Sequence, residues 1–498
     1  MSDNYLIFDL GASNGRAVVG QFFGDRFEFD IIHRFDNRPV SANHGEYFWD
    51  VLRLLSEIKL GIQKSQKKYG PCKSMAIDTW GCDFGMLDQQ GRLLGNPNTY
   101  RDPKRYDYSS QLHGILPEPE LFQLSGGPST RIMGIYQLYA LMMEKATEYR
   151  EAHTLLMMPD LFNYFLTGEM ANEFTNATMT LMVNQKTRQW EPAIFEKLGL
   201  RNDFLLPLVE PGYRLGKLSP AVCRELGVES IPVIVPATHD TASAVAGIPV
   251  TDHTRKWGFI SLGTWCIAGM ETDEPILDPR VVDIKCGNEG GVGGKNMLLR
   301  NITGLWILQQ CRNKWNKEQG EEVDWDYIDM LAENSQMQNS IIDVDDPRFG
   351  EYQEDMPGVI ARFCRQTGQD VPETIGETTR CILKSLVLKF KASFSDMSTV
   401  TEGDFELLHL VGGGTKNKLL CRWTAEAMGI PVIAGPTETT SVGNLIFQLI
   451  ADGKILNVSE GRQLCKNSYE MDEYAPADLS VWDTAYQHYK AIADTNRS

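Results

Sequence analysis

Three loops of small residues in this chain could each hold a phosphate group. The first is FDLGASNGR, from Phe8 to Arg16, which joins an apolar stretch to two glycines, a serine and an arginine. Backbone N–H groups in such a turn can surround phosphate oxygens, and a guanidinium can fork onto them. Gly11 and Gly15 allow positive φ and a close approach of the ligand to the backbone. Asp9 would repel a phosphate directly, so we expect it to hold Mg²⁺ or the waters of that ion.

The other two loops favour this interpretation over a simple β-hairpin turn. SLGTW, at 261–265, places Thr264 where Ser13 stands in the first loop. The run Gly412-Gly413-Gly414 follows an apolar strand and precedes a helix. One Gly-rich loop is a weak signal. One loop in each half of the chain, together with a glycine run, indicates a nucleotide held between two lobes.

Two common nucleotide-binding motifs are missing from the sequence. The segment EGGVGGKN is not a Walker P-loop, because Glu289 replaces its first glycine and Asn296 follows its lysine. The dinucleotide fingerprint G-x-G-x-x-G does not occur either. A nucleotide site would therefore depend on the three loops described above.

A histidine and an aspartate after an apolar strand could supply acid–base chemistry. The strand Ile231–Val235 leads into PATHDTASAVAG, so Asp240 should project into a cleft. A carboxylate within hydrogen-bond reach of a hydroxyl can accept its proton during phosphoryl transfer. The alternative is that Asp240 caps the small-residue helix that follows. His239 is either a core or surface histidine or a hydrogen-bond partner of a sugar hydroxyl.

The composition narrows the class of protein and its partners. The net charge of −18 argues against nucleic acid or an anionic membrane as a partner. The 498 residues allow about three average domains or two large lobes. The ten cysteines show no C-x-x-C pair and no zinc spacing, so we interpret them as reduced core residues. No signal peptide or membrane-spanning run is visible, and we expect a cytoplasmic protein.

The apolar pattern predicts the elements that position these residues. In the first part of the chain, we expect strands at 5–10, 16–23, 26–35 and 74–79, and a helix at 47–69. Three antiparallel strands followed by a helix and a strand differ from strict βαβ alternation. The chain then becomes more helical and irregular, with helices expected at 137–145 and 159–166.

A weak internal repeat relates the two halves. WGFISLGTWCIAG and NYLIFDLGASNGRAVVG share an apolar strand, the pair LG, a turn with a hydroxyl and a second apolar strand. We therefore place a lobe boundary near residue 245. In the second half we expect helices at 298–315, 379–393, 416–428 and 440–450, strands at 405–411 and 431–433, and a peripheral tail after Ala475. Asn301 and Gln309 would lie near one face of the helix 298–315, because they are eight residues apart.

Several segments, in this order, resemble the FGGY family of carbohydrate kinases. They are FDLGASNGR, SMAIDTWGCDFGMLDQQG, LLMMPDLFNYFLTG, VPATHDTASAVAG, SLGTW, KNMLLRNITGLWILQQ and LHLVGGGTKNKLL. The resemblance implies an α/β fold with two ribonuclease-H-like lobes of the actin-like ATPase type around a central cleft. Residues 1–245 would bind the sugar and form the first phosphate loop. Residues 246–498 would supply the second phosphate loop and bind the adenine nucleotide.

By position, the resemblance also implies a site. The residues that would bind ATP are Ala12, Ser13, Asn14, Gly15, Arg16, Thr264, Asn301, Gln309 and Gly413. Gly81, His239 and Asp240 would contact the sugar, with Asp240 as the general base and Mg²⁺ near Asp9. The partners would be a small ketose and ATP, with no nucleic acid and no membrane, and the oligomeric state is not predicted.

Two of the segments, IDTWGCDF and NITGLWILQQ, resemble the branch of the family that phosphorylates L-rhamnulose at its 1-hydroxyl. The alternatives are another sugar kinase of the family, for L-fuculose or a pentulose, or a non-kinase actin-like or chaperone-type ATPase. A sugar sensor without catalysis is disfavoured by the intact His239-Asp240 pair.

The roles of three further residues, Gln137, Trp80 and Asp78, are not decided by the sequence. Gln137 stands where the family usually has a lysine, which leaves the role of that lysine in doubt. Trp80 would stack on the sugar or belong to the core. Asp78 would face Asp9 near the metal or cap a strand end.

Overall fold

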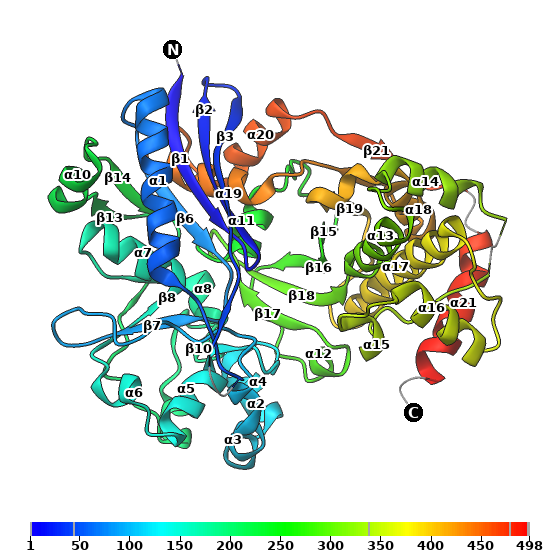
Figure 1. The fold of residues 1–498 in the computed structure, drawn as a ribbon, viewed down its shortest axis with the longest axis horizontal. Helices are drawn as coiled ribbons and strands as arrows, with labels where there is room; N and C mark the ends of the chain where they lie inside the picture. Colours follow the sequence, from blue (N-terminus) through cyan, green and yellow to red (C-terminus); the bar gives the residue numbers. More distant parts are fainter. Residues whose placement is uncertain (1, 43–44, 337–338, 478–479, 496–498) are drawn as a thin grey trace. The chain divides into compact units, whose positions relative to one another are not determined.

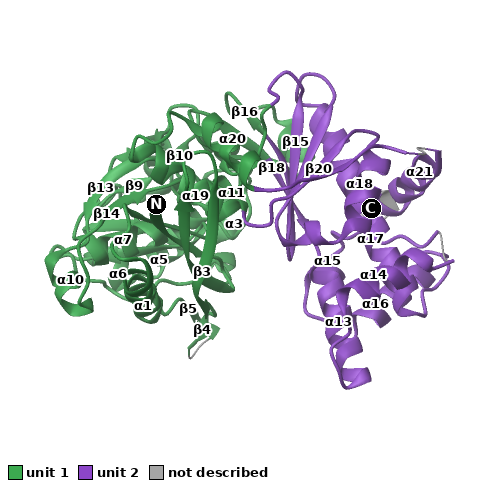
Figure 2. Ribbon diagram, turned by 90° about the horizontal axis from the view of Figure 1, so that it is seen from above, with its two compact units in different colours: residues 1–251, 271–298, 439–468 green, residues 252–270, 299–438, 469–498 purple. Residues whose placement is uncertain are grey.

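The computed structural model describes residues 2–42, 45–336, 339–477 and 480–495. They form two compact units, coloured green and purple in Figure 2. Unit 1 comprises Met1–Thr251, Glu271–Leu298 and Thr439–Ser468, and unit 2 comprises Asp252–Met270, Leu299–Glu438 and Tyr469–Ser498. The units therefore do not coincide with the sequence halves 1–245 and 246–498, because two segments of the second half belong to unit 1.

A six-stranded sheet forms the centre of unit 1 (Figure 1). Its order is β13-β14-β6-β1-β2-β3, with β1 antiparallel to β2 and parallel to β6. The strands of this sheet are β1 (Asp3–Leu10), β2 (Asn14–Phe22), β3 (Phe27–Asp36), β6 (Met75–Thr79), β13 (Tyr213–Lys217) and β14 (Pro232–Val235). The four predicted strands of the N-terminal part are confirmed. The predicted helix 47–69 begins later, at Val51, because Tyr47–Phe48 forms the short strand β5.

The remaining elements of unit 1 surround this sheet. Its helices are α1 (Val51–Tyr69), α2 (Lys104–Asp107), α3 (Ser109–Ile115), α4 (Glu118–Ser125), α5 (Gly134–Met143), α6 (Thr147–Glu151), α7 (Met158–Thr167), α8 (Phe174–Thr178), α9 (Pro192–Leu198), α10 (Pro220–Leu226), α11 (Asp240–Ala246), α12 (Arg280–Asp283), α19 (Thr439–Ala451) and α20 (Val458–Ser468). Its other strands are β4 (Val40–Ser41), β5, β7 (Phe84–Leu87), β8 (Thr154–Met157), β9 (Asn172–Glu173), β10 (Val183–Asn184), β11 (Gln189–Trp190), β12 (Leu208–Val209) and β17 (Gly287–Gly290). The many short elements between α2 and β12 agree with the predicted helical, irregular region.

Helices α1 and α19 cover opposite faces of the unit 1 sheet. Gly61 of α1 lies against Ala17, whereas Gly20 lies against Leu445 of α19. Ala17 and Gly20 are an odd number of residues apart on β2, so their side-chain positions point to opposite faces. Because both faces are covered, β1 is buried from Tyr5 to Phe8, and it reads as a continuous apolar run.

The strands of unit 2 repeat the topology of unit 1. In the second sheet, β15 is antiparallel to β16 and parallel to β19, as β1 is to β2 and β6. The order of this sheet includes β18-β16-β15-β19-β20-β21. The elements are β15 (Trp257–Leu262), β16 (Trp265–Thr272), β18 (Asn296–Thr303), β19 (Leu407–Val411), β20 (Val432–Ala434), β21 (Asp472–Tyr474), α13 (Trp306–Gln319), α14 (Trp325–Asn334), α15 (Pro347–Gly350), α16 (Met356–Gln366), α17 (Ile375–Ser398), the 3₁₀ turn η2 (Gly413–Lys416), α18 (Lys418–Met428) and α21 (Ser480–Thr495). The predicted internal repeat is confirmed.

The predicted helix 298–315 is wrong. The segment forms strand β18 and then, after Gly304, helix α13. A Cβ on Gly304 would lie 2.7 Å from the backbone nitrogen of Cys266, so a close approach of the backbone to β16 separates the two elements. A short apolar run fits a buried strand or a buried helix equally well by periodicity. Asn301 and Gln309 therefore do not share a helix face.

The predicted peripheral tail is a packed helix. Trp482 and Tyr489 of α21 are buried, and α21 packs on α17 and α18. Among the described residues, no helix has the length and apolar character needed to cross a bilayer. All ten cysteines are free thiols, and nine of them are buried, as predicted.

Candidate active site

The carboxyl ends of three strands bring several predicted site residues of unit 1 together. In the register of β1 and β6, Asp9 pairs with Asp78. The strand β14 lies beside β6. Beyond the end of β14, His239 forms a β-bridge with Thr79, the last residue of β6. The Thr79 N–H donates to the carbonyl of Thr238 at 2.9 Å. Side chains that follow the carboxyl ends of neighbouring parallel strands meet at one edge of the sheet, where ligands of α/β proteins bind.

The first predicted phosphate loop is the turn between β1 and β2. Ser13 and Asn14 are exposed and Ala12 is half-buried. The buried side chain of Asn37 fixes this turn, since its Nδ2 donates to the carbonyl of Gly11 at 2.8 Å. The Asn37 backbone N–H also donates to the carbonyl of Ser13 at 3.0 Å.

Gly11 and Gly15 do not use the positive φ that glycine allows. Neither residue is among the glycines with positive φ. Gly15 lies within β2, and a Cβ there would overlap the ring of Phe35. Glycine is therefore needed at 15 for packing on β3 instead of for an unusual backbone conformation.

Asp9 and Arg16 face each other across the β1–β2 hairpin. The Arg16 guanidinium donates to Oδ2 of Asp9 from Nε at 3.0 Å and from a terminal nitrogen at 2.6 Å. The residues predicted to meet a metal and a phosphate are thus neighbours, and they form an ion pair in this structure. Such a pair neutralises the Asp9 carboxylate beside the phosphate loop.

Asp240 is the first residue of α11, and the capping alternative is wrong. The N-cap of α11 is His239, and within the described part of the chain no side chain caps this helix. The Asp240 carboxylate accepts a hydrogen bond from Oγ1 of Thr241 at 3.3 Å, and 31% of its side chain is exposed. Its carboxylate is therefore partly exposed and does not cap α11.

Tight packing of α11 against α19 fixes the position of Asp240. A Cβ on Gly443 of α19 would overlap the carbonyl oxygen of Ser243. A Cβ on Gly247 would likewise overlap the carbonyl of Thr439. The small-residue sequence TASAVAG thus lets two helices approach more closely than larger side chains would allow.

Burial and mutual repulsion raise the pKa values of the site carboxyl groups. Burial, and secondarily the negative charge of Asp9, raises the pKa of Asp240 to about 7. Burial and then the Asp9 charge raise the pKa of Asp78 well above its usual range, although a hydrogen bond from Asn444 at 2.6 Å opposes this shift. Perturbed carboxyl groups clustered at strand ends are typical of catalytic sites.

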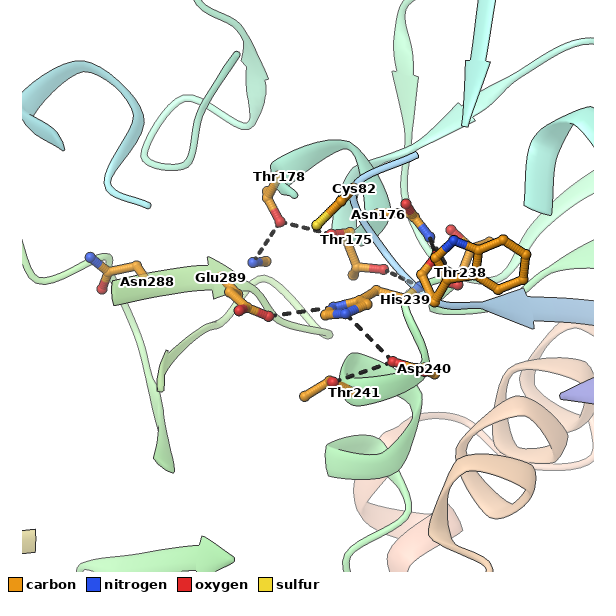
Figure 3. Close-up of polar contacts among 12 residues, drawn as sticks. Cys82, Thr175, Asn176, Thr178, Thr238, His239, Asp240, Thr241, Asn288 and Glu289 are labelled. Atoms are coloured by element: carbon orange, nitrogen blue, oxygen red, sulfur yellow. Dashed lines mark hydrogen bonds and ion pairs between the residues drawn. The ribbon is translucent and has the colours of Figure 1, made fainter. Parts of the chain in front are cut away.

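His239 lies between two acidic side chains (Figure 3). Its Nε2 is 3.5 Å from Oδ1 of Asp240, and its Nδ1 is 3.4 Å from Oε2 of Glu289. Burial lowers the pKa of His239 to about 4, so the imidazole is neutral at physiological pH. Gly81 packs beside this ring, because a Cβ at 81 would lie 3.3 Å from Cδ2 of His239. The structure therefore brings the three predicted sugar-contacting residues together.

The sequence analysis missed the residues that hold the His239 loop. The buried carboxylate of Glu173 accepts hydrogen bonds from the N–H and hydroxyl of Thr238, at 3.0 and 2.7 Å, and from the hydroxyl of Thr175 at 2.6 Å. Oγ1 of Thr175 accepts from the N–H of His239 at 3.2 Å. The side-chain amide of Asn176 also donates to the carbonyl of Thr238, at 3.2 Å. The signal available in the sequence was Glu173, followed after Phe174 by the hydroxyl of Thr175 and the amide of Asn176.

Trp80 and Gln137 belong to a buried network instead of pointing to a ligand. Trp80 is 4% exposed, and its indole N–H donates to Oδ2 of Asp83 at 2.9 Å. The indole N–H of Trp49 donates to the same oxygen at 2.6 Å. Arg105 forms a buried ion pair with Asp83 and also donates to Oε1 of Gln137. The core interpretation of Trp80 is correct. Where the family usually has a lysine, this chain has an acceptor for the Arg105 cation.

Unit 2 holds the other predicted nucleotide residues. Thr264 is exposed in the β15–β16 turn, and its hydroxyl lies 3.4 Å from Oε1 of Gln309 on α13. Gly412 adopts φ 86° and packs on Leu262, at the end of β15, whereas Gly413 is exposed with open space around it. These residues form a second small-residue edge at strand ends. Asn301 is not in these turns; it lies on β18, where its side chain is exposed.

Two domain models of one protein family together match most of the chain. The model of the N-terminal domain of FGGY carbohydrate kinases matches residues 4–247, and that of the C-terminal domain matches residues 258–451. The chain belongs to the FGGY family of carbohydrate kinases. As a member of this family it is a sugar kinase that uses ATP, and the predicted family and enzyme class are confirmed.

Individual FGGY relatives match nearly the whole chain. A rhamnulokinase from Bacteroides thetaiotaomicron is 35% identical over 492 residues, which cover 98% of this chain and 99% of that protein. A rhamnulokinase from Bacillus subtilis is 32% identical over 478 residues, covering 95% of this chain and 96% of that protein.

Solved structures of FGGY-type sugar kinases share the fold. A ligand-bound xylulose kinase from Lactobacillus acidophilus has a TM-score of 0.82 at 15% identity, covering 100% of this chain and 99% of that chain. A glycerol kinase from Plasmodium falciparum with ADP has a TM-score of 0.77 at 14% identity, covering 99% and 97%. The predicted two-lobed α/β fold class is therefore confirmed.

Proposed function

We propose that this FGGY kinase phosphorylates L-rhamnulose at its 1-hydroxyl, with MgATP as the phosphoryl donor and Asp240 as the general base. The observation that carries the proposal is the position of the Asp240 carboxylate at the strand ends of unit 1. This carboxylate does not cap α11, and its Oδ1 lies 3.5 Å from Nε2 of His239. The choice of ketose rests on the relatives named rhamnulokinase, which match 95% or more of this chain.

Phosphoryl transfer to a sugar hydroxyl is favoured by a base whose pKa is close to neutral pH. A sugar hydroxyl is a poor nucleophile until its proton is removed, and catalysis of phosphoryl transfer is mostly positioning and charge stabilisation. The pKa of Asp240, raised to about 7 by burial, suits this task. Asp240 would take the hydroxyl proton as the oxygen bonds to the γ-phosphorus, and ADP would leave with the electrons of the broken P–O bond.

The two groups of loop residues would bind the nucleotide. Ala12 to Arg16 would contribute N–H groups, a hydroxyl and a guanidinium, and Thr264, Gln309 and Gly413 would contribute the second set. Asn301, on β18, remains a predicted contact of the ATP. Neutralisation of the phosphates by local donors is necessary because the chain has a net charge of −18.

Asp9 and Asp78 are the residues that would hold Mg²⁺ or its waters. Among the described residues, Oδ1 of the buried Asp78 has no hydrogen-bond partner, and carboxylate oxygens suit this ion. Within the same residues, no group of three or more His, Cys, Asp or Glu side chains could hold a metal by itself. Mg²⁺ usually binds one or two carboxylates together with phosphates and waters. When bound, Mg²⁺ would neutralise charge on the transferred phosphoryl group.

A panel of ketoses tests the proposal. Purified protein with MgATP is assayed for ADP release with L-rhamnulose, L-fuculose, L-ribulose and D-xylulose. We expect L-rhamnulose to give the highest kcat/KM, and ³¹P–¹H NMR of the product to place the phosphate on C1. A higher kcat/KM for another ketose would contradict L-rhamnulose as the substrate. Phosphate on another carbon would contradict phosphorylation at the 1-hydroxyl.

A further inference from the structure

Glu289 is an acidic side chain that the reaction proposed above does not use. It lies on β17 and is 5% exposed. Oε2 of Glu289 is buried and has no hydrogen-bond partner among the residues that the structure describes. A buried carboxyl oxygen without a hydrogen bond is unfavourable, so its retention needs an explanation.

The backbone around Glu289 is held firmly in place. The Gly290 N–H donates to Oγ1 of Thr178 at 3.0 Å, and a Cβ on Gly290 would lie 2.8 Å from the ring of Phe174. On the other side, the Asn288 side-chain amide donates to the carbonyl of Gly126 at 2.8 Å. These contacts attach β17 to helices of the same unit. The Glu289 carboxyl group is therefore presented to its neighbours from a rigid strand.

The neighbour that Glu289 faces is His239 (Figure 3). Nδ1 of His239 is itself buried and lacks a hydrogen bond within the described residues, and it lies 3.4 Å from Oε2 of Glu289. The opposite ring nitrogen, Nε2, lies 3.5 Å from Oδ1 of Asp240. Both distances exceed an ordinary hydrogen bond by a few tenths of an ångström, and such contacts often shorten when substrate binds. One ring thus connects Glu289 to the general base.

We propose that Glu289 is a positioning residue, whose carboxyl group donates a hydrogen bond to Nδ1 of His239 and so leaves the ring proton on Nε2, directed at Asp240. This inference rests on the proposed role of Asp240. A neutral imidazole carries one N–H, and the partner of one ring nitrogen decides which nitrogen carries it. The Nε2–H would then stabilise the ionised form of Asp240, which is the form that accepts the proton.

The protonation states of the pair agree with this arrangement. Burial, and secondarily the charge of Asp240, raises the pKa of Glu289 to about 8, so its carboxyl group is protonated and a donor at neutral pH. Burial keeps His239 neutral, with a pKa of about 4. The other titratable group near Glu289 is the buried Cys82, whose pKa is raised well above its usual range by burial, so its thiol is uncharged.

Two substitutions at 289 separate a positioning role from a structural one. Glu289→Gln keeps an N–H donor for Nδ1, and we expect it to retain kcat/KM within about threefold of wild type. Glu289→Ala removes the donor, and we expect a loss of roughly 10- to 100-fold, by analogy with the partners that orient metal-binding histidines. Glu274→Ala, an exposed residue of the neighbouring segment, is the matched control. Comparable melting temperatures of the Gln and Ala variants would show that folding does not cause the difference.

The pH dependence of kcat/KM distinguishes a positioning role from a structural one, because a purely structural role of Glu289 would not shift it. Loss of the Nε2–H donor disfavours ionised Asp240, so the acidic limb of kcat/KM should shift to higher pH in Glu289→Ala and stay in place in Glu289→Gln. An unchanged limb in Glu289→Ala, or an equal loss of kcat/KM in both variants, would overturn the proposal.

A second measurement does not depend on the proposed reaction. ¹⁵N NMR of the eight histidines, with His239→Gln to assign the signal, should show the Nε2–H tautomer at His239 in the wild type. A wild-type Nδ1–H tautomer would contradict the inference even if the ketose panel succeeded. Failure of the ketose panel with the Nε2–H tautomer present would instead contradict the proposed function.

Discussion

A carboxylate that accepts a proton from an alcohol at neutral pH needs a pKa close to that pH, and the surroundings of Asp240 provide it. Burial raises its pKa to about 7, and the Asp9 charge acts in the same direction. The Arg16 ion pair with Asp9 limits this repulsion. With a pKa near 7, Asp240 is present in both its protonated and its ionised form at neutral pH.

The activity should fall as the pH decreases through the pKa of Asp240. Only the ionised carboxylate can act as the base, so kcat/KM should decrease about tenfold per pH unit well below pH 7. His239 stays neutral through this range, because its pKa is about 4. Direct chromatographic detection of ADP between pH 5.5 and 8.5 would measure the profile. A flat kcat/KM over this range would mean that a different group accepts the proton.

At the level of single residues, the sequence pointed to the proposed site residues but not to the side chains that contact them. Asp240, His239 and Gly81 follow apolar strands, and strand ends can be read from the pattern. Glu289 could not be found in this way, because it reaches His239 from a segment 50 residues further along the chain. The packing role of Gly15 could not be read from the sequence, since only the structure shows the ring of Phe35 against it.

At the level of elements, the position of Asp240 depends on the contact between α11 and α19. Gly443→Ala would force the new Cβ against the carbonyl of Ser243, a backbone atom that cannot rotate away. We expect destabilisation by roughly 1–3 kcal/mol and a lower melting temperature, as for overpacked cores. The kcat should also fall, because α11 carries Asp240.

Gly114→Ala is the matched control for this prediction. Gly114 lies in α3, is exposed, and a Cβ there would meet open space. Alanine in an exposed helix interior should stabilise the protein by about 0.5–1 kcal/mol. Calorimetry of both variants compares the same chemical change at a packed and at an open position. Equal melting temperatures would show that the α11–α19 contact is not tight.

The elements differed in how well the sequence predicted them. The strands β1, β2 and β6 were found because their apolar runs are bounded by Gly, Ser or polar residues. The segment 298–315 was misassigned as one helix, because only Gly304 and Leu305 separate its strand from its helix. Packing of that glycine on Cys266 is a tertiary contact, which local periodicity cannot reveal.

At the level of the whole molecule, the chain repeats one topology in two units. The repeat of β1, β2 and β6 as β15, β16 and β19 places a small-residue turn at equivalent strand ends in each unit. The sequence revealed this repeat through two LG turns. It did not reveal that 271–298 and 439–468 belong to unit 1, because the chain returns to that unit only through tertiary contacts.

The predicted nucleotide residues are divided between these units, whereas the proposed base and its partners all belong to unit 1. Sugar binding and proton acceptance should therefore be separable from ATP binding by substitution. Replacement of Asp240 should leave both ligands bound and remove only the chemical step.

The most direct measurement is therefore the single-turnover rate of Asp240→Asn with MgATP and saturating ketose, together with calorimetric binding of the ketose. Asparagine preserves the shape of the side chain but cannot accept the proton. We predict a rate lower by roughly 10²- to 10⁴-fold, with ketose affinity nearly unchanged. A near-normal rate in this variant would contradict the assignment of Asp240 as the base and with it the account of the site.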